Sequence, residues 1–205
     1  MKIVLDNLGK RFHYHWIFKA LSIELESNKS YAITGANGSG KSTLLKIISG
    51  IDSANEGILR YSLDEKIISN EEVYKHITIA APYQELIEEL TLSELLDFHS
   101  EFRQLSISKG AFLTETKLDN SSNKQIRDFS SGMKQRVKLG LALFTQSECT
   151  LLDEPTTNMD QQGIDWYLKT VDKIIGNRTL IISSNMPYEY DFCNKIIQIE
   201  SYKQN

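Results

Sequence analysis

The sequence has few cysteines, no long apolar run and no basic block, and each of these shortages excludes a class of protein. Its two cysteines, Cys149 and Cys193, form no metal-spaced pair, which favours reduced thiols in the cytosol. No apolar stretch approaches the ~18 residues of a membrane-spanning helix, and Met1–Asp6 meets a carboxylate too early for a secretory signal. The net charge of −4, without clustered lysine or arginine, argues against nucleic acid as a partner. We therefore expect a cytoplasmic protein that reaches a membrane only through a partner.

Apolar runs and turn residues along the 205 residues predict a single α/β domain in which a mostly helical segment interrupts a sheet. Thr91–Glu94 has the spacing of a capping box at the start of a helix in that segment. We place the helical segment at about 85–145 and the sheet-forming parts at about 1–84 and 146–205. Strands are expected at 2–8, 21–25, 30–34, 57–61, 77–81, 149–153 and 179–184.

The segment Gly35–Thr43 fits the phosphate-binding pattern G-x-x-x-x-G-K-[ST], with the sequence Gly-Ala-Asn-Gly-Ser-Gly-Lys-Ser-Thr. Its glycines let consecutive backbone N–H groups surround a phosphate. Lys41 can reach the β- and γ-phosphate oxygens, and the Ser42 hydroxyl is placed to bind Mg²⁺. The β-prone run Ser30–Thr34 precedes the loop and a helical pattern follows it, so the helix dipole also favours phosphate. We expect a nucleotide to bind at this loop.

An apolar strand that ends in two carboxylates, Asp153 and Glu154, follows later in the chain. A carboxylate at the end of a buried strand commonly holds Mg²⁺ opposite a phosphate-binding loop, and we expect this role for Asp153. Glu154 lies just beyond the strand, where it could orient or deprotonate an attacking water. The acidic pair therefore predicts that the nucleotide is hydrolysed.

A second helix start also carries groups that bind anions. Ser130, Ser131 and Gly132 precede an amphipathic pattern, and hydroxyls at a helix N-terminus can face a phosphate. The pentapeptide by itself is better explained as a simple N-cap. Two phosphate-facing helix ends exceed the need of one nucleotide, however, which suggests a nucleotide shared between two copies of the chain.

The segment between the first two predicted strands is rich in aromatic residues and is expected to form a loop or an edge. Each ring there can pack in the core or stack on a nucleotide base. His13 and His15 would share one face of a strand and could bind a metal, but no third ligand is evident, so we favour a structural role. The aromatic residues are Phe12, Tyr14, Trp16 and Phe18.

Taken together, these motifs resemble those of the ATP-binding cassette (ABC) family, the ATPase subunits of ABC transporters. The resemblance covers nearly the whole chain and keeps the family's order. The matching segments are Gly35–Thr43 as the Walker A loop, Gln84 in the Q-loop, Phe129–Met133 as the signature motif, Leu151–Pro155 as Walker B and Thr157–Asp160 as the D-loop.

Two departures from the family pattern affect the site. The usual signature Leu-Ser-Gly-Gly-Gln is Phe-Ser-Ser-Gly-Met here, although Ser130 and Gly132 keep the phosphate-facing positions. The switch histidine expected after the last core strand is Asn185, which can donate a hydrogen bond to a γ-phosphate but cannot become cationic.

The resemblance implies a P-loop NTPase core with a mixed sheet flanked by helices, an N-terminal antiparallel β-subdomain and a helical insertion. It implies ATP as the substrate, Mg²⁺ as the cofactor, and a head-to-tail dimer of identical or related subunits around two ATP molecules. The dimer would drive a permease on a separate chain at the inner face of the cell membrane. The alternatives are a soluble ABC-type ATPase in assembly, translation or DNA maintenance, and an ATP switch with low turnover.

The same resemblance assigns roles to individual residues. Phe12 best fits the position that stacks on adenine, with Trp16 as the alternative. The catalytic residues would be Glu154, Lys41, Gln84 and Asn185. The residues that bind Mg²⁺ would be Ser42, Gln84 and Asp153. The nucleotide would be bound by Phe12, Gly35, Ala36, Asn37, Gly38, Ser39, Gly40, Lys41, Ser42 and Thr43, and in the dimer by Ser130, Ser131 and Gly132.

Overall fold

A computed structural model describes residues 1–203 of the protein. Its contacts divide the chain into two compact units, which are described separately below. Unit 1 comprises 1–79, 147–154 and 174–205, and unit 2 comprises 80–146 and 155–173. Unit 2 thus includes residues 155–173 together with the segment that begins at residue 80.

One sheet of unit 1 is antiparallel and contains four strands in the order β2-β1-β4-β5. Its strands are β1 (Lys2–Phe12), β2 (His15–Leu25), β4 (Glu56–Leu63) and β5 (Lys66–Ile68). β1 and β2 form a hairpin in which Phe12 pairs with His15, and β2 is an edge strand of the sheet, so of the two expected alternatives the aromatic-rich segment takes the edge and not the loop. The alternating burial of 21–25 breaks at Ala20, whose φ is 54°, and the register shifts there, so Phe18 and Leu21 are both buried although they lie three residues apart.

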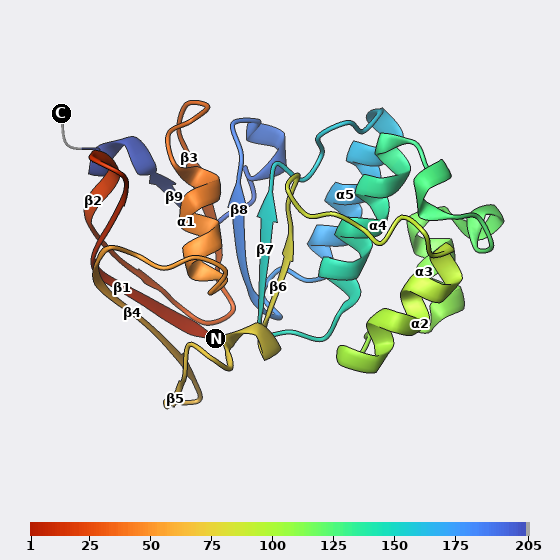
Figure 1. Ribbon diagram of the computed structural model, residues 1–205, viewed down its shortest axis with the longest axis horizontal. Coiled ribbons are helices and arrows are strands. Elements are labelled where there is room, and N and C mark those ends of the chain that lie inside the picture. Colours follow the sequence, from red (N-terminus) through yellow and green to blue (C-terminus); the bar gives the residue numbers. More distant parts are fainter. Residues whose placement is uncertain (204–205) are drawn as a thin grey trace. The chain divides into compact units, whose positions relative to one another are not determined.

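The second sheet has five strands in the order β6-β7-β8-β3-β9 (Figure 1). β3 runs parallel to both β8 and β9, and β7 runs parallel to β8. The strands are β3 (Ser30–Thr34), β6 (Ile77–Ala80), β7 (Cys149–Asp153), β8 (Thr179–Ser183) and β9 (Lys195–Gln198). The expected P-loop core and N-terminal antiparallel subdomain are therefore confirmed.

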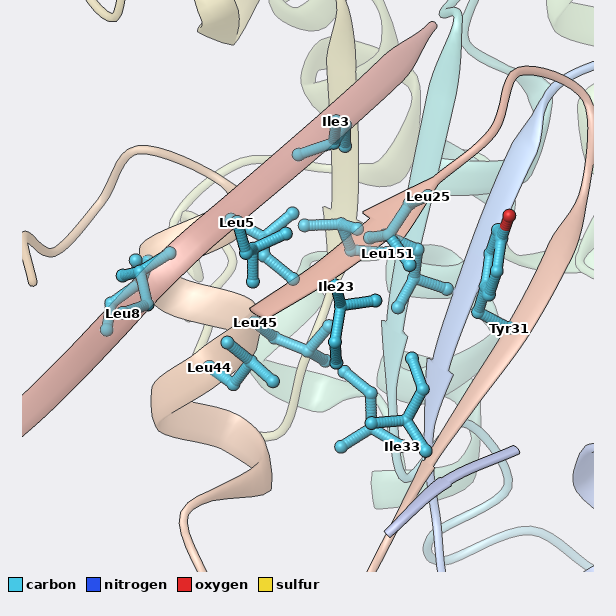
Figure 2. Packing of buried hydrophobic residues seen from close by; sticks show 14 of the residues in the cluster. Ile3, Leu5, Leu8, Ile23, Leu25, Tyr31, Ile33, Leu44, Leu45 and Leu151 are labelled. Atoms are coloured by element: carbon cyan, nitrogen blue, oxygen red, sulfur yellow. The ribbon is translucent and has the colours of Figure 1, made fainter. Parts of the chain in front are cut away.

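One hydrophobic core joins both sheets of unit 1 to α1 (Lys41–Ile48). β7 and β8 are buried along their whole length, and β3 along all but its last residue, which is typical of strands covered on both faces. Figure 2 shows the side chains of the strands and of α1 meeting in this core. The residues labelled there are Ile3, Leu5, Leu8, Ile23, Leu25, Tyr31, Ile33, Leu44, Leu45 and Leu151. The core fixes the strand ends and the helix start from which the site is built.

Unit 2 consists mainly of helices whose starts are capped by side chains. Thr91 and Glu94 form the predicted capping box before α2, and Ser108, Ser130 and Asp160 cap the other three. The helices are α2 (Leu92–Phe102), α3 (Lys109–Thr116), α4 (Ser131–Phe144) and α5 (Gln161–Asp172). Phe112 and Phe144 meet edge to face, with their ring centroids 5.9 Å apart, in the core between α3 and α4.

Short 3₁₀ helices connect the larger elements. They are η1 (Val73–Lys75), η2 (Asp119–Ser121), η3 (Ile126–Asp128), η4 (Pro187–Glu189) and η5 (Ile199–Tyr202). Across residues 1–203, none of the helices has the length and apolarity that a membrane span requires.

Candidate functional site

A pocket of about 200 Å³ in unit 1 lies over the glycine-rich loop. It brings together loop residues and Glu154, which are far apart in the sequence. The residues that line it are Ile17, Asn37, Gly38, Gly40, Lys41, Ser42, Thr43 and Glu154. The pocket therefore joins the predicted phosphate-binding loop to the carboxylate predicted to act on water.

Gly40 makes the sharp connection between the loop and α1. It is the N-cap of α1, and its φ of 107° lies in a region that L side chains rarely adopt. A Cβ at this position would also collide with the side chain of Ile17. The first N–H groups of α1 have no intrahelical partners, and the residues that carry them, Lys41, Ser42 and Thr43, line the pocket. Such a helix start binds anions, and phosphate in particular.

The ammonium group of Lys41 is held by the loop itself. Nζ donates to the carbonyl of Gly35 at 2.7 Å and to that of Ala36 at 3.3 Å. An ammonium has three N–H donors, so one remains for a phosphate oxygen. Because the side chain is buried, its charge acts in a medium that screens it less than water does.

Asp153 ends β7 as an almost fully buried carboxylate, with 1% of its surface exposed. Its Oδ1 has no hydrogen-bond partner among residues 1–203, and neither does the buried Oγ of Ser183, the register partner of Asp153 on β8. A buried charge without a partner destabilises the fold unless a cation or a hydrogen-bond donor pairs with it. Carboxylate and hydroxyl oxygens are the ligands that Mg²⁺ prefers, so the residues present fit this ion.

Glu154 follows Asp153 in a backbone conformation that is rare for a side-chain-bearing residue, with φ of 45°. Its N–H donates to the carbonyl of Ser183 at 2.8 Å, which anchors this turn to the end of β8. The turn directs Glu154 into the pocket while Asp153 stays in the sheet. Backbone strain of this kind is concentrated at functional sites.

Asn185, at the position of the expected switch histidine, contacts the phosphate-binding loop. Its Nδ2 donates to Oδ1 of Asn37 at 2.9 Å, and both residues are exposed. The contact joins the segment after β8 to a residue that lines the pocket.

Unit 2 contains the predicted signature residues at the start of α4. Ser130 Oγ accepts the N–H of Met133 at 3.3 Å, so its hydroxyl proton remains available to donate to another group. Ser130 and Ser131 are exposed at this helix end, whereas Phe129 is buried in place of the family's leucine. Within the same unit, Gln135 Nε2 donates to the carbonyl of Pro155 at 2.8 Å, which ties α4 to the chain after Glu154.

Gln84 lines a groove of about 710 Å³ that belongs to unit 2. Its Oε1 accepts the N–H of Ala81 at 2.9 Å, which closes a tight turn after β6. The groove mixes acidic, basic and apolar side chains, and Glu88 and Lys134 form an ion pair in it. Its lining residues are Pro82, Gln84, Glu85, Leu86, Ile87, Glu88, Glu89, Lys134 and Lys138.

The aromatic candidates for adenine stacking do not line the pocket of unit 1, whereas Ile17 does. Phe12 is 49% exposed near the β1–β2 turn, with Lys10 Nζ 5.1 Å from its ring centroid. The Trp16 ring lies near two cations, 4.7 Å from Lys19 Nζ and 5.4 Å from Arg11 Cζ. Within the described part of the chain no group of three His, Cys, Asp or Glu residues could hold a metal, so His13 and His15 have no third ligand there.

The parallel sheet, the glycine-rich loop at the start of α1 and the acidic end of β7 define a P-loop ATPase. The chain belongs to the ABC transporter family: the family profile described as "ABC transporter" matches residues 18–157, more than half of the chain. ATP binding and ATP hydrolysis are the activities of this domain family, and the prediction made from the five motifs is confirmed.

Individual relatives support the same assignment. The chain is 31% identical to the tungstate uptake system ATP-binding protein TupC of Peptoclostridium acidaminophilum, over 98% of this chain and 95% of TupC. It is 26% identical to the sulfate/thiosulfate import ATP-binding protein CysA of Mesostigma viride, where 98% of this chain spans only 60% of the relative. A solved structure described as a dimeric post-hydrolysis state of an ATP-binding cassette bound to ADP and Pi has the same fold. Its TM-score is 0.79 at 21% identity, with 97% and 95% of the two chains covered.

The exchange Asn185→His is expected to raise ATP turnover by about tenfold, because a protonated imidazole stabilises developing charge on a γ-phosphate better than a neutral amide does. Steady-state kcat with Mg-ATP measures this effect. Asn37→Ala serves as the control, because it breaks the Asn37–Asn185 hydrogen bond without adding an imidazole. If Asn185→His leaves turnover unchanged or lowers it, asparagine is not what limits hydrolysis in this chain.

Proposed function

We propose that this chain is the ATP-hydrolysing subunit of an ABC transporter, a single ABC domain that works as a head-to-tail dimer and drives a permease on a separate chain. The observation that carries the proposal is the exposed, hydroxyl-bearing start of α4 in unit 2. Together with the helix start at the pocket of unit 1, it supports two candidate phosphate-binding helix starts in each chain. In the proposed dimer, Ser130, Ser131 and Gly132 of one copy close on the ATP held by the loop of the other.

Within each pocket, the proposed chemistry is positioning and electrostatic stabilisation, with little covalent work for the protein. Lys41 neutralises charge on the β- and γ-phosphates, and Thr43 holds the α-phosphate. Glu154 orients the attacking water and accepts its proton, and Asn185 donates a hydrogen bond to the γ-phosphate. Phe12 is proposed to stack on the adenine.

Mg²⁺ is proposed to be held by Asp153 and Ser42 of unit 1. The unpartnered Oδ1 of Asp153 and the position of Ser42 in the pocket lining support this assignment. Bound there, the ion would supply positive charge to the β- and γ-phosphate oxygens.

The permease is proposed to dock in the groove of unit 2 and to hold the chain at the inner face of the membrane. ATP adds contacts across the dimer that ADP cannot make, so hydrolysis reopens the dimer and this movement is passed to the permease. The names of the tungstate and sulfate relatives, an uptake and an import ATP-binding protein, support the transport role.

Affinity purification of the tagged chain from detergent-solubilised native membranes tests this proposal. We expect a stoichiometric polytopic membrane protein among the bound partners, identified by mass spectrometry. Purely soluble partners, with no bait in the membranes, would instead favour a soluble ABC-type ATPase.

Two matched variants locate the contact. Ile87→Glu places a charge in the groove, where Ile87 is 41% exposed, and should remove the membrane partner. Ile67→Glu makes the same exchange on β5, where Ile67 is 81% exposed, and should retain it. If both variants lose the membrane partner, or if both retain it, the permease does not dock in the groove.

A further inference from the structure

The segment that follows β9 touches the phosphate-binding loop from outside the pocket. β9 runs parallel to β3, and Gln198 pairs with Thr34, the residue before the loop. Because parallel strands end at the same edge of a sheet, the chain leaves β9 beside Gly35 and Ala36. η5 begins there with Ile199 and Glu200.

Ile199 fills the space against the glycines of the loop. It is fully buried, and a Cβ at Gly35 would lie 2.9 Å from its Cγ2. A Cβ at Gly40 would lie 3.5 Å from its Cδ1. Ile199 therefore packs near both ends of the loop, and Gly35, with φ of 146°, has no room for a side chain.

Glu200 adds a directional contact to this packing. Its Oε1 accepts the N–H of Ala36 at 3.0 Å. The carbonyl of Ala36 in turn accepts the N–H of Ser39 at 3.0 Å and the ammonium of Lys41 at 3.3 Å. The Ala36 N–H lies in the same peptide plane as the Gly35 carbonyl, which accepts the Lys41 ammonium at 2.7 Å, so Glu200 and Lys41 bind the two polar groups of one peptide unit.

We infer that Glu200 is a positioning residue for ATP binding, acting through Ala36 on Lys41. Its hydrogen bond fixes the orientation of the Gly35–Ala36 peptide plane, and this orientation holds the Gly35 carbonyl against the ammonium of Lys41, which lines the pocket. The inference rests on nucleotide binding at the loop and is independent of the dimer and of the permease. A carboxylate close to a phosphate site also repels the nucleotide, so the test must separate hydrogen bonding from charge.

Two substitutions make this separation. Glu200→Ala removes both the acceptor and the charge, whereas Glu200→Gln keeps an acceptor oxygen and removes only the charge. We expect Glu200→Ala to raise the Kd for ATP about 3- to 10-fold, the range for loss of one ordinary hydrogen bond. Its KM should rise in proportion, while kcat changes less than about twofold because the contact acts on binding. Glu200→Gln should bind ATP at least as tightly as the natural chain.

Fluorescence titration with a labelled ATP analogue, together with steady-state kinetics, measures these values on the full chain. Glu71→Ala, at an exposed glutamate outside the pocket lining, controls for the change in net charge and should leave Kd unaltered. Tighter binding by both Glu200 variants would show that the carboxylate acts only by repulsion and would overturn the inference. Unchanged binding by Glu200→Ala would overturn it as well. If the natural chain itself fails to bind ATP, the fault lies in the proposed function and not in the role of Glu200.

Discussion

Replacing Glu154 by glutamine is expected to lower ATP turnover at least about a hundredfold while leaving ATP binding intact, the loss typical for removal of a general base. Glutamine has the same shape, so the turn at φ 45° and the backbone bond to Ser183 can persist. What disappears is the carboxylate that can accept a proton from water in the pocket. Phosphate release and equilibrium ATP binding, measured on the same preparation, separate the two effects.

The same variant reports on the dimer. If ATP closes two copies and hydrolysis opens them, Glu154→Gln should accumulate an ATP-bound dimer that is visible by size-exclusion chromatography. Glu65→Gln is a suitable control, because Glu65 is also a glutamate at positive φ (66°) but lies in the β4–β5 turn outside the pocket lining. A variant that remains monomeric with saturating Mg-ATP would refute the head-to-tail arrangement for this chain.

The loop and the acidic strand end could be predicted from the sequence because their chemistry is local. In Gly35–Thr43 the spacing of glycine, lysine and serine dictates both the turn and the ligands, and the preceding and following residues have clear strand and helix patterns. The capping box at Thr91–Glu94 was predictable for the same reason, since both of its hydrogen bonds join residues three apart.

Contacts between distant segments could not be predicted in this way. Ile17 lines the pocket because the β1–β2 hairpin continues past the residues whose alternation is evident. Glu200 reaches Ala36 because β9 lies beside β3, a pairing across 164 residues that no local pattern encodes.

The exchange Asp153→Asn is expected to have two opposite effects, a more stable protein and a less active one. Asp153 is 1% exposed and its Oδ1 has no partner among residues 1–203, so folding removes this carboxylate oxygen from water without a hydrogen bond in return. Asparagine is neutral, and its amide can donate to the unpartnered Oγ of Ser183 on the adjacent strand. We expect the unfolding free energy to rise by about 1–3 kcal/mol in the absence of Mg²⁺ and nucleotide. For a domain of this size, each kcal/mol raises Tm by about 2–4 °C.

Activity should change in the other direction, because the anionic ligand that Mg²⁺ favours is lost. We expect ATP hydrolysis to fall at least about a hundredfold, and ATP affinity to lose most of its dependence on Mg²⁺. Thermal melts with a chelator measure the change in stability, and ATP titrations over a Mg²⁺ series measure the change in Mg²⁺-dependent ATP binding. Asp64→Asn in the exposed β4–β5 turn is the matched control.

A lower Tm for Asp153→Asn would show that the carboxylate stabilises the fold by itself. Retained dependence on Mg²⁺ would place the ion on other ligands. A gain in stability together with a loss of activity would mean that β7 retains a destabilising charge because the reaction requires it.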